Sequence, residues 1–350
     1  MTWDARRRHR LSALHHPSQP SDPASSTRPL LVVRDNSPSL AALEGGVVAI
    51  GNFDGVHRGH RTVIAAAVRR AEALDGPAVA LTFEPHPRRF LRPQNPLFRL
   101  TDEAAKLRLL AASGLDGALV LTFDRALASL SAEDFITRIL VGRLAVKGVA
   151  IGFDFHYGKD RRGSPGFLAA EGERLDFAVE ILPPLEDEGR PVSSGSIRAA
   201  LAAGRVIEAA ELIGHPWFVT GTIIPGDRRG RGLGFPTANL KLDPECGLKH
   251  GIYAVRAHVH GEVRDGVASF GRRPTFDDGP PLLEVHLFEF SGELYGAAID
   301  VAFLGWIRAE AKFAKIEDLV ARMDEDARLA RAALARTNAA FPALGTFVEG

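Results

Sequence analysis

Two histidines, three residues apart, follow a short apolar run in the first part of the chain. The run Val47–Phe53 has the β-branched composition of a strand, and a helical pattern follows it. His57 and His60 therefore fall on one face of a first helical turn, where free N–H groups and the helix dipole favour phosphate. Imidazole can donate a hydrogen bond to phosphate and can carry positive charge. The alternative is a pair of ordinary surface histidines, but Gly55 and Gly59 permit close backbone approach and favour a triphosphate site.

A second group of anion-binding side chains precedes another predicted helix. Ser193 and Ser194 supply hydroxyls, and Arg198 supplies a guanidinium, at the start of a helix expected over Ile197–Ala203. Hydroxyl, guanidinium and free N–H groups at a helix N-terminus all bind anions. The sequence therefore predicts a second phosphate-binding helix end.

A third candidate site lies in the second half of the chain. Four glycines and three arginines within Pro225–Gly234 make a loop that can wrap phosphates, although a solvated hairpin loop is the alternative. Thr237 and Asn239 alternate, so both side chains face the same side of an extended segment. Further on, Glu284 shares one face of a predicted strand with apolar neighbours. Spacing alone favours a surface acid on an edge strand for Glu284.

The spacing of apolar residues predicts the elements that position the first two groups. Short β-branched runs alternate with helical patterns up to about residue 213, which favours an α/β domain with a parallel sheet covered on both faces. The expected strands are Val47–Phe53, Ala78–Phe83, Ala118–Phe123, Val146–Phe155 and Phe177–Leu182. Helices are expected over Arg61–Leu74, from a cap at Thr101 to Ala112, from a cap at Ser131 to Val141, and over Ile197–Ala203.

The pattern changes after Pro216 to one strand after another, which predicts a small β-barrel. One long helix over Ile316–Arg336 follows it. We therefore expect a first domain over residues 30–213 and a second over residues 214–340. The strands expected in the second domain are Trp217–Ile224, Ile252–His260, Val263–Phe270, Leu282–Phe290 and Ala298–Trp306.

Composition excludes several classes of protein. The 350 residues carry 43 Lys+Arg and 43 Asp+Glu, whereas a dedicated nucleic-acid binder normally has a basic excess. One cysteine, Cys246, excludes an internal disulfide and a Cys-rich metal site, and no apolar run reaches the length of a membrane span. Residues 1–29 read as a disordered tail without a secretory signal. We expect a cytoplasmic protein without nucleic-acid or membrane partners; its oligomeric state is left open.

The first half of the chain resembles the bacterial FAD synthetases, a branch of the nucleotidylyltransferase superfamily. The segment Gly51–His60, with its His-x-Gly-His ending, carries the resemblance, and the motifs Thr82–Pro87, Gly152–Gly158 and Val192–Arg198 follow in order. The resemblance implies a Rossmann-like domain that adenylates FMN to FAD. Its implied site residues are the ATP ligands Gly51, Phe53, His57, His60, Ser193, Ser194 and Arg198, with Asp154 as an FMN contact. Of these, His57 and His60 are also implied as catalytic residues. A turn aspartate without ligand is the alternative for Asp154, and Gly195 departs from the hydroxyl residue usual in the family.

The second half resembles riboflavin kinases through the string Gly234–Asn239 and the strand around Glu284. The resemblance implies that Thr237 and Asn239 hold ATP phosphate and Mg²⁺, for which their oxygens are suitable ligands. It also implies that Gly226, Gly234 and Pro236 contact ATP, that Glu284 is the catalytic base, and that Phe313 covers riboflavin. For Phe313 a core position is the alternative.

Together the resemblances imply a bifunctional enzyme with riboflavin, FMN and ATP as substrates, Mg²⁺ as cofactor, and FMN and FAD as products. Two other functions stay open. The first is a riboflavin kinase whose N-terminal module is degenerate, which Gly195 would allow. The second is a flavin-binding regulatory protein without catalysis.

Overall fold

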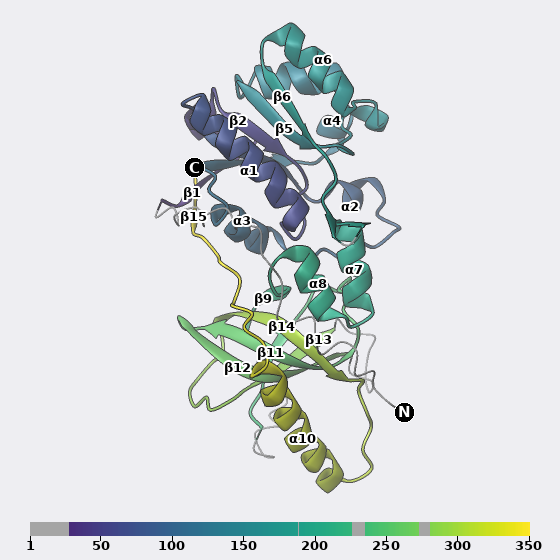
Figure 1. Cartoon of the computed structure of the whole chain (residues 1–350). Helices are drawn as coiled ribbons and strands as arrows, with labels where there is room; N and C mark the ends of the chain where they lie inside the picture. The colour runs from purple at the N-terminus through teal and green to yellow at the C-terminus, as the bar shows by residue number, and fades with distance from the viewer. Residues whose placement is uncertain (1–27, 188, 226–234, 273–280) are drawn as a thin grey trace.

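The computed structural model describes residues 28–187, 189–225, 235–272 and 281–350 (Figure 1). Most of the expected N-terminal tail lies outside these residues, as do the predicted ATP ligands Gly226 and Gly234. The described chain forms an α/β domain and an antiparallel barrel that follows it. The predicted fold class is therefore confirmed.

A parallel sheet of seven strands organises the first domain, in the order β15-β1-β4-β3-β2-β5-β6. Its strands are short and apolar because both faces are covered; all four residues of β2 are buried, for example. The strands are β1 (Leu30–Arg34), β2 (Val47–Ile50), β3 (Ala78–Glu84), β4 (Gly117–Thr122), β5 (Gly148–Gly152), β6 (Ala178–Leu182) and β15 (Phe347–Glu349).

Helices cover the two faces of this sheet and bury separate hydrophobic clusters. α1 (Arg58–Ala73) and α3 (Glu103–Ala111) pack on the face of Val47 and Ala49. η3 (Phe135–Val141) and α6 (Pro165–Leu175) pack on the face of Val48 and Ile50. Shorter elements are η2 (Pro38–Leu43), α2 (Pro87–Leu91), α4 (Arg125–Ala128), α5 (Ala132–Asp134), η4 (Lys159–Arg161), β7 (Glu186–Asp187) and β8 (Arg190–Pro191).

The second domain is a six-stranded antiparallel sheet, in the order β10-β13-β12-β11-β14-β9. A bridge between Ile224 and Asn239 joins its two ends, so the sheet is nearly closed. α10 (Ile316–Leu334) covers one outer part of it, where Ala330 and Leu334 pack on Ile252. The strands are β9 (Phe218–Thr222), β10 (Ala238–Lys241), β11 (Gly251–Val259), β12 (Glu262–Gly271), β13 (Leu282–Leu287) and β14 (Ala298–Arg308).

Helices α7 (Ser194–Ala202) and α8 (Val206–Ile213) join the two domains. Their apolar residues lie in one buried cluster with the interior of the barrel, although they precede the expected boundary at residue 214. The interface also contains a two-bond ion pair between Arg108 and Asp300, at 2.7 and 2.8 Å. The domain limits proposed from the sequence remain a prediction, and packing groups these two helices with the barrel.

The C-terminal segment returns from the barrel domain to the first sheet (Figure 1). β15 pairs in parallel with β1, and Leu30 N–H donates to Thr346 O at 2.9 Å. Glu349 accepts two hydrogen bonds from Arg34, at 2.9 and 3.1 Å. This strap, residues 339–350, therefore spans both domains.

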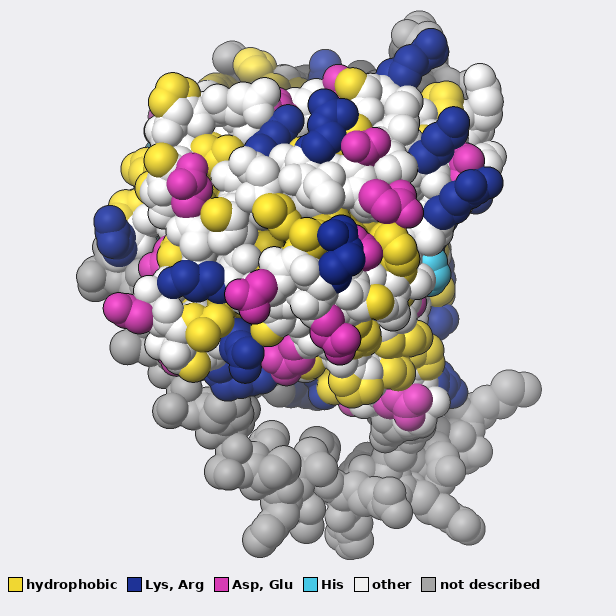
Figure 2. Space-filling model, turned by 90° about the horizontal axis from the view of Figure 1, so that it is seen from above, with side chains coloured by type: hydrophobic (Ala, Val, Ile, Leu, Met, Phe, Trp, Pro, Cys, Tyr) yellow, Lys and Arg dark blue, Asp and Glu magenta, His cyan; other side chains and the backbone are white. Residues whose placement is uncertain are grey.

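One local prediction differs from the structure. The N-cap of α3 is Asp102, whose carboxylate accepts from Ala105 N–H at 2.7 Å. Thr101, the expected cap, instead accepts from Gly55 N–H through its hydroxyl at 3.1 Å. β1, β10, β15, α6 and α8 were not expected from the sequence. The face of the molecule seen in Figure 2 carries side chains of both signs interspersed, in keeping with the zero formal net charge.

Candidate functional sites

The histidine pair lies where the sequence places it, at the start of α1 and beyond the end of β2. The rings of His57 and His60 stack with centroids 3.6 Å apart and an interplanar angle of 19°. His57 is the N-cap of α1, because its Nδ1 accepts from His60 N–H at 3.3 Å. The ring of Phe53 contacts His60 edge-on and is itself buried, so any contact of residue 53 with ATP falls to its backbone.

Both imidazoles are neutral at pH 7 in this structure. The pKa of His57 is lowered to about 4, mainly by burial and in addition by the positive charges of Arg198 and Arg61. Burial also holds the pKa of His60 well below its usual value, and His57, Lys106 and Arg198 are added causes. A neutral imidazole can still donate one hydrogen bond to phosphate. The positive charge that the pair could carry is therefore absent in this structure.

The loop before α1 has an unusual backbone. Phe53 and Val56 have φ angles of +49° and +39°, a region that β-branched and bulky residues rarely adopt. Gly55 has φ +83°, and a Cβ atom there would lie 2.9 Å from Leu100. Such backbone persists only where the surroundings over-determine it, which is common at ligand-binding loops.

Asp54 holds this loop to two other segments. Its carboxylate accepts from Leu100 N–H at 2.8 Å and from Thr101 N–H at 3.1 Å. The other carboxylate oxygen is paired with the guanidinium of Arg198. The hydroxyl of Ser194 donates to the carbonyl of Asp54 at 3.1 Å. The loop, the segment around Leu100 and the N-terminus of α7 thus meet at one buried carboxylate.

The predicted ligands on α7 are therefore near the histidine pair but already have protein partners. Arg198 binds Asp54 and also donates through Nε to Phe98 O at 2.5 Å. Ser193 caps α7 in a reciprocal pair with Ser196. Gly195, the departure from the family pattern, leaves room for a Cβ atom, which would make ordinary contact with Ser193 Oγ at 3.5 Å. A side chain with a hydroxyl group would fit at that position.

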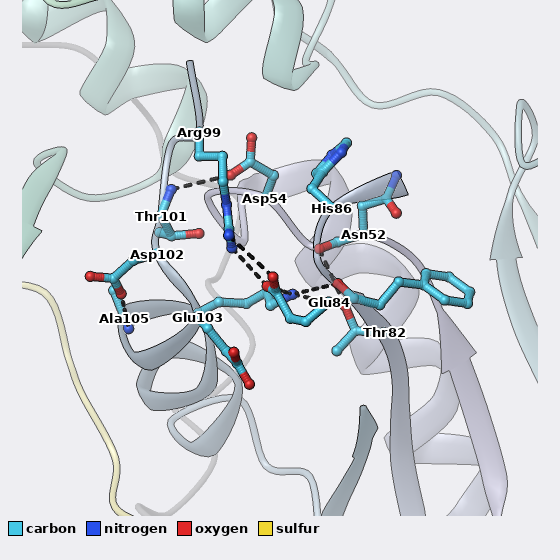
Figure 3. A network of polar contacts seen from close by, with 12 residues as sticks. Asn52, Asp54, Thr82, Glu84, His86, Arg99, Thr101, Asp102, Glu103 and Ala105 are labelled. Carbon is cyan, nitrogen blue, oxygen red and sulfur yellow. Dashed lines mark hydrogen bonds and ion pairs between the residues drawn. The ribbon is translucent and has the colours of Figure 1, made fainter. Parts of the chain in front are cut away.

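A buried charged network lies under the same loop, at the end of β3 (Figure 3). Glu84 accepts two hydrogen bonds from Arg99, at 2.7 and 3.1 Å, and pairs with Lys106 Nζ at 2.7 Å. Lys106 is only 2% exposed and also donates to Thr82 Oγ1 at 3.2 Å. Thr82 in turn donates to Asn52 O at 3.3 Å. The network therefore reaches the histidine loop through Asn52.

His86 and Asp154 follow the carboxyl ends of β3 and β5, which lie on either side of β2 in the sheet. His86 lies beside Asn52 and Asp54, and burial lowers its pKa to about 4 (Figure 3). Asp154 follows β5 and is exposed, next to Phe153, whose exposure is 50%. Asp154 is thus accessible to a ligand at the carboxyl edge of the sheet, where open α/β sheets bind their ligands.

The predicted residues of the barrel domain come together across two strands. Asn239 on β10 is directly opposite Glu284 on β13, so the two side chains share one face. Asn239 is 4% exposed, and its Oδ1 has no hydrogen-bond partner among the described residues. Glu284 is half-buried rather than fully solvated. A buried oxygen that is left unpaired is costly, which favours a ligand at this point.

The remaining predicted residues of this site have less definite surroundings. Thr237 is half-buried and its carbonyl accepts from Asn239 Nδ2 at 3.3 Å. Pro236 is exposed, and its carbonyl contacts His286 Nδ1 at 3.0 Å. Phe313 precedes α10 and is half-buried, outside the buried core clusters. The segment 235–239 therefore lies along β13, with its motif side chains beside Glu284.

The fold and these two sites define a two-domain enzyme of the nucleotide-binding class, with a parallel-sheet site and a barrel site. Two family models match: FAD synthetase over residues 39–196 and riboflavin kinase over residues 213–334. The chain belongs to the family of bifunctional riboflavin kinase/FMN adenylyltransferases.

Curated relatives with that name support this membership over most of their length. The chain is 39% identical to the Haemophilus influenzae protein over 291 residues, which are 83% of this chain and 94% of that relative. It is 38% identical to the Escherichia coli K12 protein, over 84% of this chain and 94% of that relative. For the Bacillus subtilis protein the identity is 38%, over 80% and 90% respectively.

A crystal structure from Streptococcus pneumoniae has a similar fold. It is named as a macrolide-efflux protein, has a TM-score of 0.76 and 31% identity, and the match covers 86% of this chain and 98% of that chain. In the described part of the present chain, no helix has the length and apolar character needed to span a membrane.

Three charged residues near the first site were missed by the sequence analysis. Asp54 lies inside the quoted motif, so its spacing gave a signal that was not used. Lys106 falls among apolar residues of a predicted helix, which marks a cation that needs a buried partner. Arg99 gave no signal, because its role depends on the tertiary approach of Glu84.

Proposed function

We propose that the protein phosphorylates riboflavin to FMN in the barrel domain and adenylates FMN to FAD in the parallel-sheet domain, each with ATP. Membership of the family supports both reactions. The single structural observation that carries the proposal is the presence of two separate polar sites. One contains the stacked His57 and His60 at a helix N-terminus, and the other contains Glu284 opposite Asn239.

In the barrel domain, Glu284 is proposed to accept the proton of the terminal hydroxyl of riboflavin. That oxygen attacks the γ-phosphorus of ATP, and ADP leaves. A general base must lie within hydrogen-bond reach of the proton it takes, so Glu284 would sit beside the ribityl end. The half-buried position of Glu284 restricts water around it.

Mg²⁺ is part of this proposal because the residues fit it. The buried Oδ1 of Asn239 lacks a partner among the described residues, and the hydroxyl of Thr237 precedes it by two positions. Both are hard oxygen ligands of the kind that Mg²⁺ takes. The ion would supply charge neutralisation on the phosphates of ATP.

In the parallel-sheet domain, a phosphate oxygen of FMN is proposed to attack the α-phosphorus of ATP, and pyrophosphate leaves. The N-terminus of α1 and the two imidazoles would hold the phosphates. Arg198 is proposed to orient the loop through Asp54 and to add positive charge. Asp154, exposed at the end of β5, is proposed to contact FMN. Catalysis then rests on positioning and charge stabilisation, without a covalent enzyme intermediate.

Two variants separate the reactions, and each is the control for the other. His57→Ala with His60→Ala should abolish FAD formation from FMN while FMN formation from riboflavin stays near normal. Glu284→Ala should abolish FMN formation but leave FAD formation when FMN is supplied. Chromatography of the products measures both, in one reaction from riboflavin and ATP and in a second from FMN and ATP. If either folded variant lost both activities, the assignment of two sites would be wrong.

The alternative of a kinase with a degenerate first domain gives a different result. In that case wild-type protein converts riboflavin to FMN but makes no FAD from FMN and ATP. The room for a Cβ atom at Gly195 argues that the loss of one hydroxyl leaves the rest of the site intact. A cytoplasmic location and the absence of nucleic-acid and membrane partners remain predictions from the sequence.

A further inference from the structure

The face of the barrel sheet that carries Glu284 continues beyond Asn239. On the other side of Glu284, strand pairing places Ser269 of β12 directly opposite it. Residues opposite each other in an antiparallel ladder have their side chains on the same face. Asn239, Glu284 and Ser269 therefore form one polar row across three strands.

Glu310 adds a second carboxylate to this row from a different segment. Gly271 is opposite Leu282, which shares its face with Glu284. A Cβ atom on Gly271 would lie 2.1 Å from Glu310 Oε1, so the carboxylate occupies the space that a side chain would fill. Diagonal neighbours of this kind are about 7–8 Å apart. Glu310 thus lies on the same face as Glu284, one step along the sheet.

The surroundings of Glu310 leave its carboxylate available. Its nearest ion-pair partner among the described residues is His250, with Nδ1 at 4.0 Å from Oε2. Arg308, two residues before Glu310, is paired with Asp326 through two hydrogen bonds. Burial raises the pKa of Glu310; His250 and Arg308 lower it, and the charge of Glu284 raises it.

The row also contains an atom that requires a ligand. Asn239 is 4% exposed and its Oδ1 is buried without a partner among the residues described, as noted above. This observation is independent of the two carboxylates. It indicates that something binds on this face of the sheet, between β10 and the end of β12.

We propose that Glu310 determines specificity in the kinase site by accepting a hydrogen bond from a secondary hydroxyl of the ribityl chain of riboflavin. The inference rests on the proposed kinase function. A sugar-alcohol chain presents several hydroxyl donors, and carboxylates are strong acceptors for them. One carboxylate takes the proton of the reacting hydroxyl, and the other binds the chain that carries it.

Binding of two flavins to the full-length protein tests the assignment. Riboflavin carries the ribityl chain, whereas lumiflavin has the same ring with a methyl group in its place. Fluorescence titration should show that Glu310→Ala weakens riboflavin binding by about 10-fold or more, the value of one hydrogen bond to a charged group. Lumiflavin binding should not change. Glu310→Gln keeps an oxygen acceptor and should fall between wild type and Glu310→Ala.

A second variant reaches the same carboxylate from the opposite strand. Gly271→Ala places a methyl group where Glu310 Oε1 lies and should displace the flexible end of that side chain. It should therefore reproduce the loss of riboflavin affinity, and it should add little in the Glu310→Ala background. Glu262→Ala, an exposed residue at the other end of β12, is the matched control and should leave both flavins unaffected.

The outcomes separate the inference from the proposed function. A parallel loss of riboflavin and lumiflavin binding would mean that Glu310 supports the site structurally, and unchanged riboflavin binding would mean that it makes no contact; either result overturns the proposal. Turnover gives a further readout, since the KM for riboflavin should rise while kcat changes much less. Failure of the wild-type protein to make FMN would instead refute the kinase assignment itself.

Discussion

The buried network of Glu84, Arg99 and Lys106 allows a quantitative prediction of which substitution lowers the unfolding free energy most. Glu84→Gln leaves two cations without their carboxylate, and their side chains are only 14% and 2% exposed. Breaking a buried ion pair in this way costs about 3–5 kcal/mol of unfolding free energy. Lys106→Met leaves Glu84 with both hydrogen bonds from Arg99, so its cost should be about 1–2 kcal/mol.

Urea denaturation followed by circular dichroism measures both variants and the double variant. Because Lys106→Met removes the cation that Glu84→Gln leaves unpaired, the double variant should be less destabilised than the sum of the two. A Glu84→Gln cost equal to or below that of Lys106→Met would refute the reasoning. It would mean that water or a structural rearrangement, and not Glu84, stabilises the buried ammonium group of Lys106.

The pH dependence of Glu84→Gln gives a second check. Burial already lowers the pKa of Lys106, and the charge and hydrogen bond of Glu84 oppose that shift. Without Glu84 the folded-state pKa falls further below the unfolded value of about 10.4. The unfolded chain then holds more protons than the folded one, so stability rises with pH in that window. The loss of unfolding free energy in Glu84→Gln, relative to wild type, should therefore be smaller at pH 10 than at pH 7.

Three further predictions concern other parts of the molecule. Gly195→Ala should raise the unfolding free energy by about 0.5–1 kcal/mol, since the helical position is sterically open; the urea midpoint reports it. Because the pKa of His57 is depressed to about 4, the unfolded state binds a proton before the folded state does as the pH falls below about 6.5. The unfolding free energy should therefore drop by about 3 kcal/mol by pH 4. His57→Leu should reduce that drop. Deleting residues 340–350 removes β15 and should lower the melting temperature of the parallel-sheet domain in calorimetry more than that of the barrel; an unchanged thermogram would contradict the role of the strap.

The spacing of apolar residues predicted those elements whose formation depends on nearby residues in the sequence. The strands β2 to β6 and the helix α1 follow from apolar spacing, and the position of the histidine pair follows from the strand-to-helix order. β1 and β15 were missed because they are short strands, of five and three residues, and their pairing joins positions more than 300 residues apart. No spacing rule reports such a contact.

The candidate sites show the same division. Asn239 and Glu284 were quoted from separate motifs, and only the register of β10 with β13 shows that they are opposite each other. Arg198 was expected to face phosphate, but the buried carboxylate of Asp54 takes up its guanidinium. Glu310 had no signal in sequence, because the space it occupies exists only where β12 has a glycine and another segment folds over it.

The parallel pairing of β15 with β1 also constrains how the molecule is made. During synthesis the first domain leaves the ribosome long before residues 347–349 are translated. Until then, the outer side of β1 in its sheet has no paired strand. The nascent sheet can be completed only after the entire barrel has been translated. Unpaired strand edges are templates for wrong association. The short, charged ends of β1, with Arg34 and Asp35 at its exit, are suited to protecting that edge during the delay.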